Sequence, residues 1–150
     1  MQIKIGLIRN LPHIRSSVEL LVIIMIKEIT IRDFFSFRGE HTIKLNSGVN
    51  LLLGVNGSGK TSFLNAITVL YEGIVGNGLS DLFRQWGSYA SIVNACGEDR
   101  PDCFSLSYVF DATELKKLVP SSPFQYDVHY TITVFPLGNG SNYSLCETLF

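Results

Sequence analysis

The sequence has few charged residues and almost no net charge. Charged side chains make up 17% of its 150 residues, and 12 basic residues nearly balance 13 acidic ones, which leaves a formal net charge of −1. Binding to nucleic acid or to a membrane surface through overall charge needs a large positive excess, so such a partner would have to meet a local patch or another part of a longer protein. Hydrophobic residues make up 46%, which predicts one ordinary domain with a buried core rather than a disordered chain.

Cysteine is also scarce. The three cysteines are Cys96, Cys103 and Cys146, and an odd number argues against a closed disulfide framework. Their spacing matches no zinc-binding pattern. We therefore expect reduced thiols in a cytoplasmic protein.

The sequence lacks a long hydrophobic run. The longest apolar stretch near the N-terminus, Leu20–Ile26, is much shorter than the roughly 20 residues that span a bilayer. Glu19 adjoins the stretch and no small-residue cleavage site follows it, so neither export nor membrane insertion is predicted. Since a regular strand pattern begins at Met25, we expect residues 1–24 to be an N-terminal extension outside the native protein and residues 25–150 to form the domain. N-terminal sequencing of the natively expressed protein checks this start.

Alternating apolar and polar residues predict several strands. Residues 26–32 and 41–45 alternate and are separated by a turn at Gly39, which predicts an antiparallel pair. Val49–Leu53 is nearly all apolar, which is typical of a strand buried on both faces. Residues 104–110 and 126–135 are further strands, and 143–150 is expected to pair with the latter as a hairpin, after a turn at 137–140.

Three helices complete the pattern. Apolar residues recur at helical spacing from Phe63 to Tyr71, which predicts a helix that ends in the glycines that follow. A short helix is expected around 81–86. Asp111 and Glu114 have the spacing of a helix N-cap and its partner acid, so another short helix is expected to begin after Asp111 and to stop before Pro120.

A phosphate-binding motif stands between the predicted buried strand and the first helix. Gly54–Thr61 reads Gly-Val-Asn-Gly-Ser-Gly-Lys-Thr and matches the P-loop pattern G-x-x-x-x-G-K-[ST] in full. Its glycines let backbone N–H groups approach phosphate oxygens, and the helix that follows adds its positive end. Lys60 is expected to contact the β- and γ-phosphates of ATP, and Thr61 to bind Mg²⁺. The predicted nucleotide-binding residues are Gly54, Asn56, Gly57, Ser58, Gly59, Lys60, Thr61 and Ser62.

The motifs needed for hydrolysis are missing. An ATPase needs a Walker-B aspartate for Mg²⁺ and a group that positions water. Asp111, at the end of a predicted strand, is the only candidate, and we favour its role as a helix N-cap because Ala112 follows where many ATPases carry Glu. Whether the chain is an enzyme is therefore left open at this point.

Two stretches resemble a known family. Met25–Arg38, with its phenylalanine-rich turn, and Gly54–Ile67 resemble the N-terminus of SMC/RecF-type, ABC-like AAA ATPases, closely over about residues 25–72. Tyr143–Leu149 is similar to a Y-x-I-x-E-x-L strand of the smaller RecF-like members. The resemblance implies an α/β P-loop NTPase fold, namely the N-terminal lobe of an ABC/SMC-like head with an antiparallel β subdomain.

The resemblance also implies two further residues near the nucleotide and a partner that completes the site. Arg38 matches a residue that lies near the nucleotide in the family, and Gln85 is a possible match for a glutamine that reaches Mg²⁺. For each, a solvated surface position is the alternative. Family members bind ATP between two heads, with the signature motif, Walker B and switch His in a C-terminal half, so the expected partner is that half or a second ATPase subunit. DNA is a partner by analogy alone, through roles in DNA repair, chromosome maintenance or phage defence.

Two other interpretations remain open. One is a different P-loop enzyme such as a nucleotide kinase or a GTPase, although the Asn-Lys-x-Asp motif of GTPases is absent. The other is a non-catalytic remnant that lacks the second half. For Phe34, Phe35 and Phe37, core packing is favoured over stacking on a base.

Overall fold

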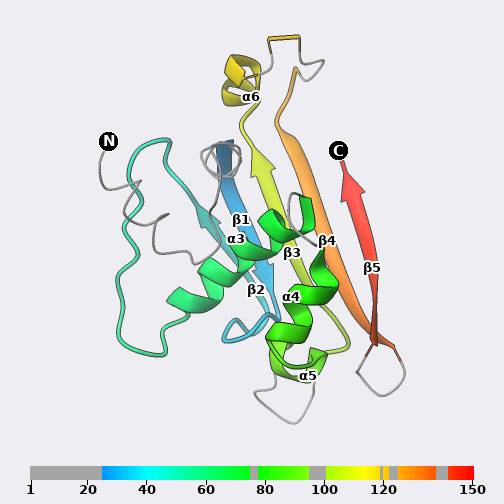
Figure 1. Cartoon of the computed structure of the whole chain (residues 1–150). Coiled ribbons are helices and arrows are strands. Elements are labelled where there is room, and N and C mark those ends of the chain that lie inside the picture. Colours follow the sequence, from blue (N-terminus) through cyan, green and yellow to red (C-terminus); the bar gives the residue numbers. More distant parts are fainter. Residues whose placement is uncertain (1–24, 75–77, 95–100, 119, 122–124, 138–141) are drawn as a thin grey trace.

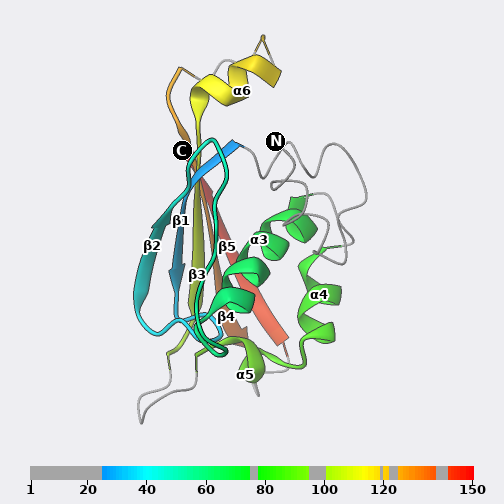
Figure 2. The ribbon, with the colours of Figure 1, turned by 90° about the vertical axis from the view of Figure 1, so that its left-hand side faces the viewer.

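The structure is a computed structural model of the whole chain. It describes residues 25–74, 78–94, 101–118, 120–121, 125–137 and 142–150. The expected extension at 1–24, Cys96 and the turn at 138–140 lie outside these residues. The described part is a single sheet with helices packed on one of its faces (Figures 1 and 2).

The sheet has five strands in the order β2-β1-β3-β4-β5. Every neighbouring pair is antiparallel, and the registers include Ile29 opposite Ile43 and opposite Tyr108. The strands are β1 Ile26–Arg32, β2 Glu40–Lys44, β3 Phe104–Phe110, β4 Val128–Leu137 and β5 Asn142–Leu149. The predicted β1–β2 pair, the strand at 104–110 and the final hairpin are confirmed.

Alternation along the strands creates the two faces of the sheet. Ile29 and Ile31 of β1, Leu106 of β3, and Ile132 and Val134 of β4 are almost completely buried against the helices. The opposite face carries a row of hydroxyl side chains in register across all five strands. This row is Thr42, Thr30, Ser107, Thr131 and Thr148. Two hydroxyl–hydroxyl bonds, Thr30–Thr42 and Thr131–Ser107, join neighbours within it.

The helices that cover the apolar face are α3 Lys60–Ile74, α4 Leu79–Gln85 and α5 Tyr89–Ile92. The helix predicted around 81–86 is confirmed as α4, whereas α5 was not predicted. Tyr108 ties α3 to the sheet, because its buried hydroxyl donates to the carbonyl of Ala66 at 2.7 Å. Burial raises the pKa of Tyr108 well above its ordinary value, so this hydroxyl stays protonated. None of the helices in the described ranges is both long and apolar enough to cross a membrane.

The short helix α6, Ala112–Leu118, lies beyond one end of the sheet (Figure 2). Asp127 accepts the N–H of Ala112 at 3.1 Å and forms an ion pair with Lys27 of β1. The hydrogen bond from Lys27 and the N–H of Ala112 hold the pKa of Asp127 below its ordinary value. These contacts attach the start of α6 to the first and fourth strands.

The prediction of a strand at Val49–Leu53 is wrong. These residues form no strand, and the side chains of Leu51 and Leu53 are 68% and 80% exposed. An isolated apolar segment becomes a strand only when a neighbouring strand bonds to its backbone, and the described sheet uses other segments on both sides of β1. The expected P-loop therefore follows an exposed segment, although it does open a helix.

Candidate functional site

The P-loop lies at the start of α3, where the helix leaves backbone N–H groups free to bind an anion. Helix α3 begins at Lys60 and has no acidic residue in its first turn, so no side chain there neutralises the positive end of its dipole. The loop and the turn at Ser36 enclose a hollow of about 200 Å³. It is lined by Ser36, Asn56, Gly57, Gly59, Lys60, Thr61 and Ser62.

A side chain at either of two glycines of the loop would crowd its neighbours. Gly59 has a φ of +91°, and a Cβ there would lie 3.1 Å from Ser36 Oγ and 3.4 Å from the Phe37 ring. At Gly54 a Cβ would lie 2.3 Å from Ser58 Oγ. Gly59 lines the hollow, so its lack of a side chain leaves its backbone open to the hollow, which is the arrangement that an anion-binding cradle requires.

The ammonium group of Lys60 lies over the loop. Its Nζ donates to the carbonyls of Gly54 at 2.7 Å and Val55 at 2.8 Å, with Ser58 Oγ at 3.4 Å. The lysine is thus curled back across the cradle and held by neutral acceptors. Phosphate oxygens would be stronger acceptors for this charge than carbonyl groups are, so these residues fit a bound triphosphate.

The structure adds a residue that the motif did not indicate. Ser36 belongs to the phenylalanine-rich turn after β1, and its hydroxyl lies 2.8 Å from that of Ser62 in α3. The turn therefore forms one wall of the phosphate hollow. Spacing in the sequence gives no sign of this contact, because the two serines are 26 residues apart.

The same turn is fixed from its other side by α5. Phe35 N–H donates to the Ile92 carbonyl at 2.6 Å, and the Asn94 side chain donates to the Phe35 carbonyl at 2.7 Å. Phe34 is fully buried between Phe35, Trp86 and Phe104. Core packing of Phe34 is thereby confirmed, whereas Phe35 and Phe37 are partly buried against the same core.

Arg38 and Gln85 lie outside the hollow. Arg38 is exposed at the far end of the turn, and its carbonyl is 2.8 Å from His41 Nε2. Gln85 is exposed at the last position of α4. Neither side chain lines the phosphate hollow, so their contacts with nucleotide and with Mg²⁺ stay predictions.

Asp111 is a helix cap. Its Oδ1 accepts the N–H groups of Thr113 at 2.7 Å and Glu114 at 3.2 Å, at the start of α6. This confirms the N-cap interpretation. Within the described ranges, no cluster of three or more His, Cys, Asp and Glu side chains could hold a metal ion. Thr61, whose hydroxyl would bind Mg²⁺, lines the hollow.

We expect the substitution Asp111→Ala to lower the free energy of unfolding by about 1 kcal/mol, because two N–H groups lose their acceptor. The affinity for Mg-ATP should not change. Urea denaturation and calorimetry measure the two quantities. Asp111→Asn is the control, since it keeps a capping oxygen and removes the charge. Loss of nucleotide binding in both variants would restore Asp111 as a metal ligand.

Comparison with known proteins finds similar features in one class of ATPases. Residues 28–93, which hold the phenylalanine-rich turn, the P-loop and α3 to α5, match the family described as "AAA domain". A stretch of 51 residues is 41% identical to the DNA double-strand break repair Rad50 ATPase of Archaeoglobus fulgidus. That stretch is 34% of this chain and only 6% of the Rad50 protein.

The fold has a counterpart among solved structures. One structure, described as "Structural biochemistry of ATP-driven dimerization and DNA stimulated activation of SMC ATPases", superposes with a TM-score of 0.60 at 17% sequence identity. The match covers 82% of this chain and 69% of the other, and at this identity it shows a shared P-loop NTPase fold. The AAA-domain match, the Rad50 relative and the SMC fold agree, and this chain is similar to part of an SMC/Rad50-type AAA ATPase head.

Proposed function

We propose that this chain binds ATP with Mg²⁺ through Gly54–Ser62. The observation that carries the proposal is the position of Lys60, whose ammonium group lies over a cradle at the start of α3 and is held by the carbonyls of Gly54 and Val55. Lys60 would move to the β- and γ-phosphates, Thr61 would hold Mg²⁺, and backbone N–H groups from Asn56 to Lys60 would bind phosphate oxygens. Ser36 would close the hollow beside Ser62.

The hollow supports only partial enclosure of the nucleotide. Pockets that enclose a whole small molecule have volumes of about 300–1,000 Å³, whereas this one has about 200 Å³. The phosphates fit such a space, and the base and ribose would lie against other surfaces. Arg38 on the neighbouring turn and Gln85 on α4 are the residues we propose there, beside the nucleotide and beside Mg²⁺.

The test is calorimetry on the whole chain. We expect a single Mg-ATP site and weaker binding without Mg²⁺. Hydrolysis should be negligible, because a signature motif and a Walker-B acid are missing from this sequence. Absence of any heat with Mg-ATP would contradict the proposal and favour a remnant without nucleotide. A clear preference for GTP would favour another P-loop enzyme.

We further propose that a second polypeptide segment, either the C-terminal half of a head or another ATPase subunit, completes the site. The support is a row of exposed apolar residues at every second position, namely Val49, Leu51, Leu53 and Val55. Residues at every second position of an extended segment point to the same side, and this row runs into the P-loop. The SMC structure above is described with ATP-driven dimerization and DNA-stimulated activation. By analogy, we propose that this chain is part of a cytoplasmic ATPase that acts on DNA.

The double substitution Leu51→Lys with Leu53→Lys tests this partner. Because both side chains are exposed, the melting temperature of the isolated chain should change little. Capture from source cells, followed by mass spectrometry, should recover a polypeptide with a signature motif and Walker B with the wild-type chain and not with the variant. Equal recovery with both chains would show that this row is not the contact.

A further inference from the structure

The strand β5 forms an open edge of the sheet. It pairs with β4 on one side, and no strand of the described ranges pairs with its other side. His129 and Phe150 exchange both of their backbone hydrogen bonds, at 3.0 and 2.9 Å. In an antiparallel pair such bonded positions alternate, so with the regular β4–β5 register the N–H and C=O groups of Ser144, Cys146 and Thr148 also point toward β4.

The residues between them present their backbone groups outward. Tyr143, Leu145, Glu147 and Leu149 therefore direct four N–H and four C=O groups away from the sheet. Their side chains lie on the helix-covered face, because Leu145 is opposite Val134 and Glu147 is opposite Ile132, both of which are buried in the core. Natural edge strands are protected from unwanted pairing by charged side chains, Pro or a bulge. Strand β5 has no Lys, no Pro and a register without a shift, and Glu147 is its one charged side chain.

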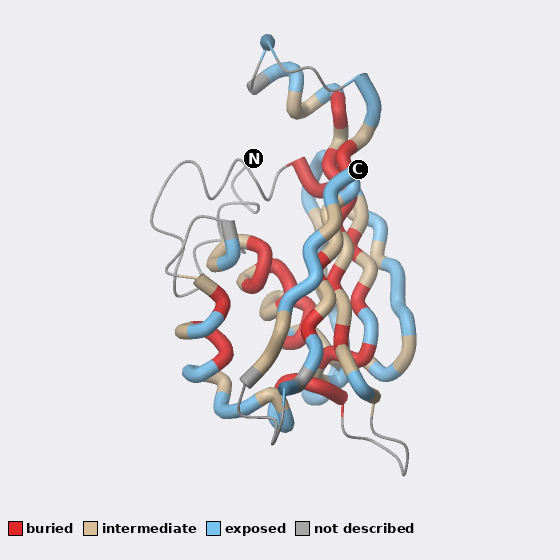
Figure 3. The backbone as a smooth tube through the Cα atoms, turned by 90° about the vertical axis from the view of Figure 1, so that its right-hand side faces the viewer, coloured by how far each residue is buried: buried red, intermediate tan, exposed pale blue. Residues whose placement is uncertain are grey.

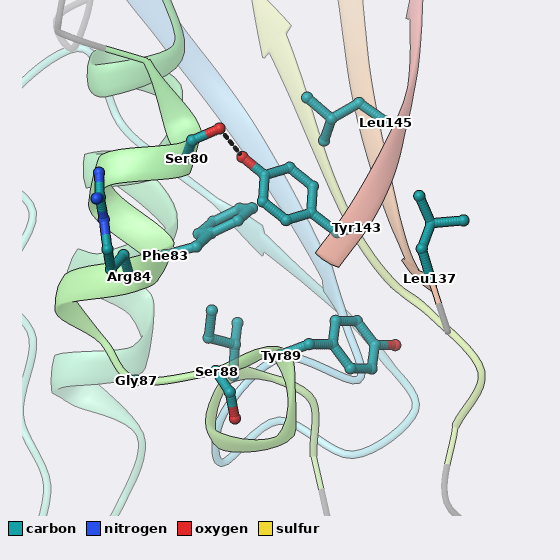
Figure 4. Close-up of a pocket in the computed structure, with 10 residues that line it drawn as sticks. Ser80, Phe83, Arg84, Gly87, Ser88, Tyr89, Leu137, Tyr143 and Leu145 are labelled. Carbon is teal, nitrogen blue, oxygen red and sulfur yellow. Dashed lines mark hydrogen bonds between the residues drawn. The ribbon is translucent and has the colours of Figure 1, made fainter. Parts of the chain in front are cut away.

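A cavity of about 750 Å³ lies beside this edge on the same face, between β5 and the helices α4 and α5 (Figure 4). Its apolar walls come from Phe83, Tyr89, Ile92, Leu137, Tyr143 and Leu145. Most of the described residues of β5 are exposed (Figure 3), and Leu145 and Leu149 are 42% and 63% exposed. The cavity is thus open to a side chain that arrives along the edge.

The wall between α4 and β5 is held in place by specific contacts. Ser80 Oγ and the Tyr143 hydroxyl are 2.7 Å apart, and the rings of Phe83 and Tyr143 meet edge-to-face with centroids 4.9 Å apart (Figure 4). These contacts fix the spacing between helix and strand. A preformed groove with an open strand edge on one side and a helix on the other can bind an extended peptide by strand addition.

We propose that the edge of β5 and this cavity form a docking site for an extended peptide segment of a protein partner, which adds to the sheet as a sixth, antiparallel strand. Backbone bonds to Tyr143, Leu145, Glu147 and Leu149 supply the pairing. The partner residues opposite Leu145 and Tyr143 place their side chains on the helix-covered face and so into the cavity. This site is separate from the nucleotide site and requires no ATP.

Charge and direction define the peptide further. Glu147 is exposed on the same face, where its carboxylate accepts from Tyr130, so a basic residue opposite it forms a favourable cross-strand pair. An antiparallel peptide meets Leu149 first, then Glu147, Leu145 and Tyr143. The matching sequence is apolar-x-basic-x-apolar-x-aromatic. The x side chains would lie on the hydroxyl-rich face beside Thr148, Cys146 and Ser144, where Thr fits.

The experiment uses a fluorescein-labelled peptide, Val-Thr-Lys-Thr-Leu-Thr-Phe, and the whole chain in fluorescence anisotropy. We expect saturable binding that weakens at least about tenfold when the Leu and Phe amides of the peptide are N-methylated, since each methyl group removes one backbone donor to β5 at an unchanged side chain. Leu145→Pro should weaken binding similarly, because proline removes an outward N–H that the fold does not use. Cys146→Ser is the matched control and should bind normally.

A charge exchange tests the register. Glu147→Lys should weaken binding of the Lys peptide several-fold and should strengthen binding of Val-Thr-Glu-Thr-Leu-Thr-Phe relative to wild type. Lys60→Ala should leave peptide binding unchanged, so a failure of the ATP proposal can be told apart from a failure of this one. Equal binding of the N-methylated peptide overturns the proposal. A second result would also overturn it, namely a wild-type chain that is a dimer and binds no peptide while Leu145→Pro is a monomer. In that case a second copy of the chain would occupy the edge of β5.

Discussion

Substitution of Lys60 by alanine should weaken Mg-ATP binding by roughly 100-fold. The reason is electrostatic, since a hydrogen bond to a charged group contributes about 1.5–3 kcal/mol and each 1.4 kcal/mol is a tenfold change in affinity. Lys60 has its ammonium group directly over the cradle, 2.7 Å from the carbonyl of Gly54. In the variant the phosphates would meet only backbone N–H groups and hydroxyls. Calorimetry with Mg-ATP measures the change.

The matched control for this change is Lys116→Ala. Lys116 is an exposed lysine of α6, so its removal alters the net charge equally without touching the P-loop. Circular dichroism and a thermal melt should be the same for both variants, because the bonds that Lys60 makes lie at the surface of an exposed loop. Similar ATP affinities for the two variants would show that nucleotide binding, if any, does not use the P-loop.

The second large effect is expected in stability. Phe34→Ala should lower the free energy of unfolding by about 3–5 kcal/mol, because truncation of a fully buried aromatic ring removes its packing and leaves a cavity. The Phe34 side chain is 0% exposed, and its ring centroid lies 4.8 Å from that of Phe35 and 5.1 Å from that of Phe104. This is a large part of the roughly 5–15 kcal/mol that stabilises a typical domain. Urea denaturation followed by Trp86 fluorescence gives the measurement.

Phe135→Ala provides the comparison for Phe34→Ala. Phe135 lies on β4 and is 40% exposed, so the same truncation should lower the free energy of unfolding much less. Phe34→Ala should also weaken the binding of Mg-ATP by the folded protein, because the turn that contains Phe34 also contains Ser36. Equal urea midpoints for the two variants would mean that the phenylalanine-rich turn is not part of the core.

Much of the local structure follows from the sequence. The alternation in β1, the strand β3 and the hairpin of β4 and β5 were predicted correctly, because a strand with one buried face needs an apolar residue at every second position. The P-loop pattern likewise predicted a helix that begins at Lys60, since its glycines and the helix start are encoded in neighbouring residues. Asp111 was identified as a cap for the same reason, because a capping side chain bonds to backbone only two and three residues away.

The relations between distant segments were decided by tertiary structure alone. Val49–Leu53 has the composition of a buried strand, yet Leu53 is exposed because a strand also needs a neighbour to bond to its backbone. Ser36 becomes part of the phosphate hollow only when the turn after β1 folds onto α3. The cavity beside Leu145 exists because α4 and β5, more than 50 residues apart, meet through Ser80 and Tyr143. Periodicity and capping are local properties that a sequence displays directly, whereas pairing partners and clefts depend on which of many compatible surfaces the whole chain brings together.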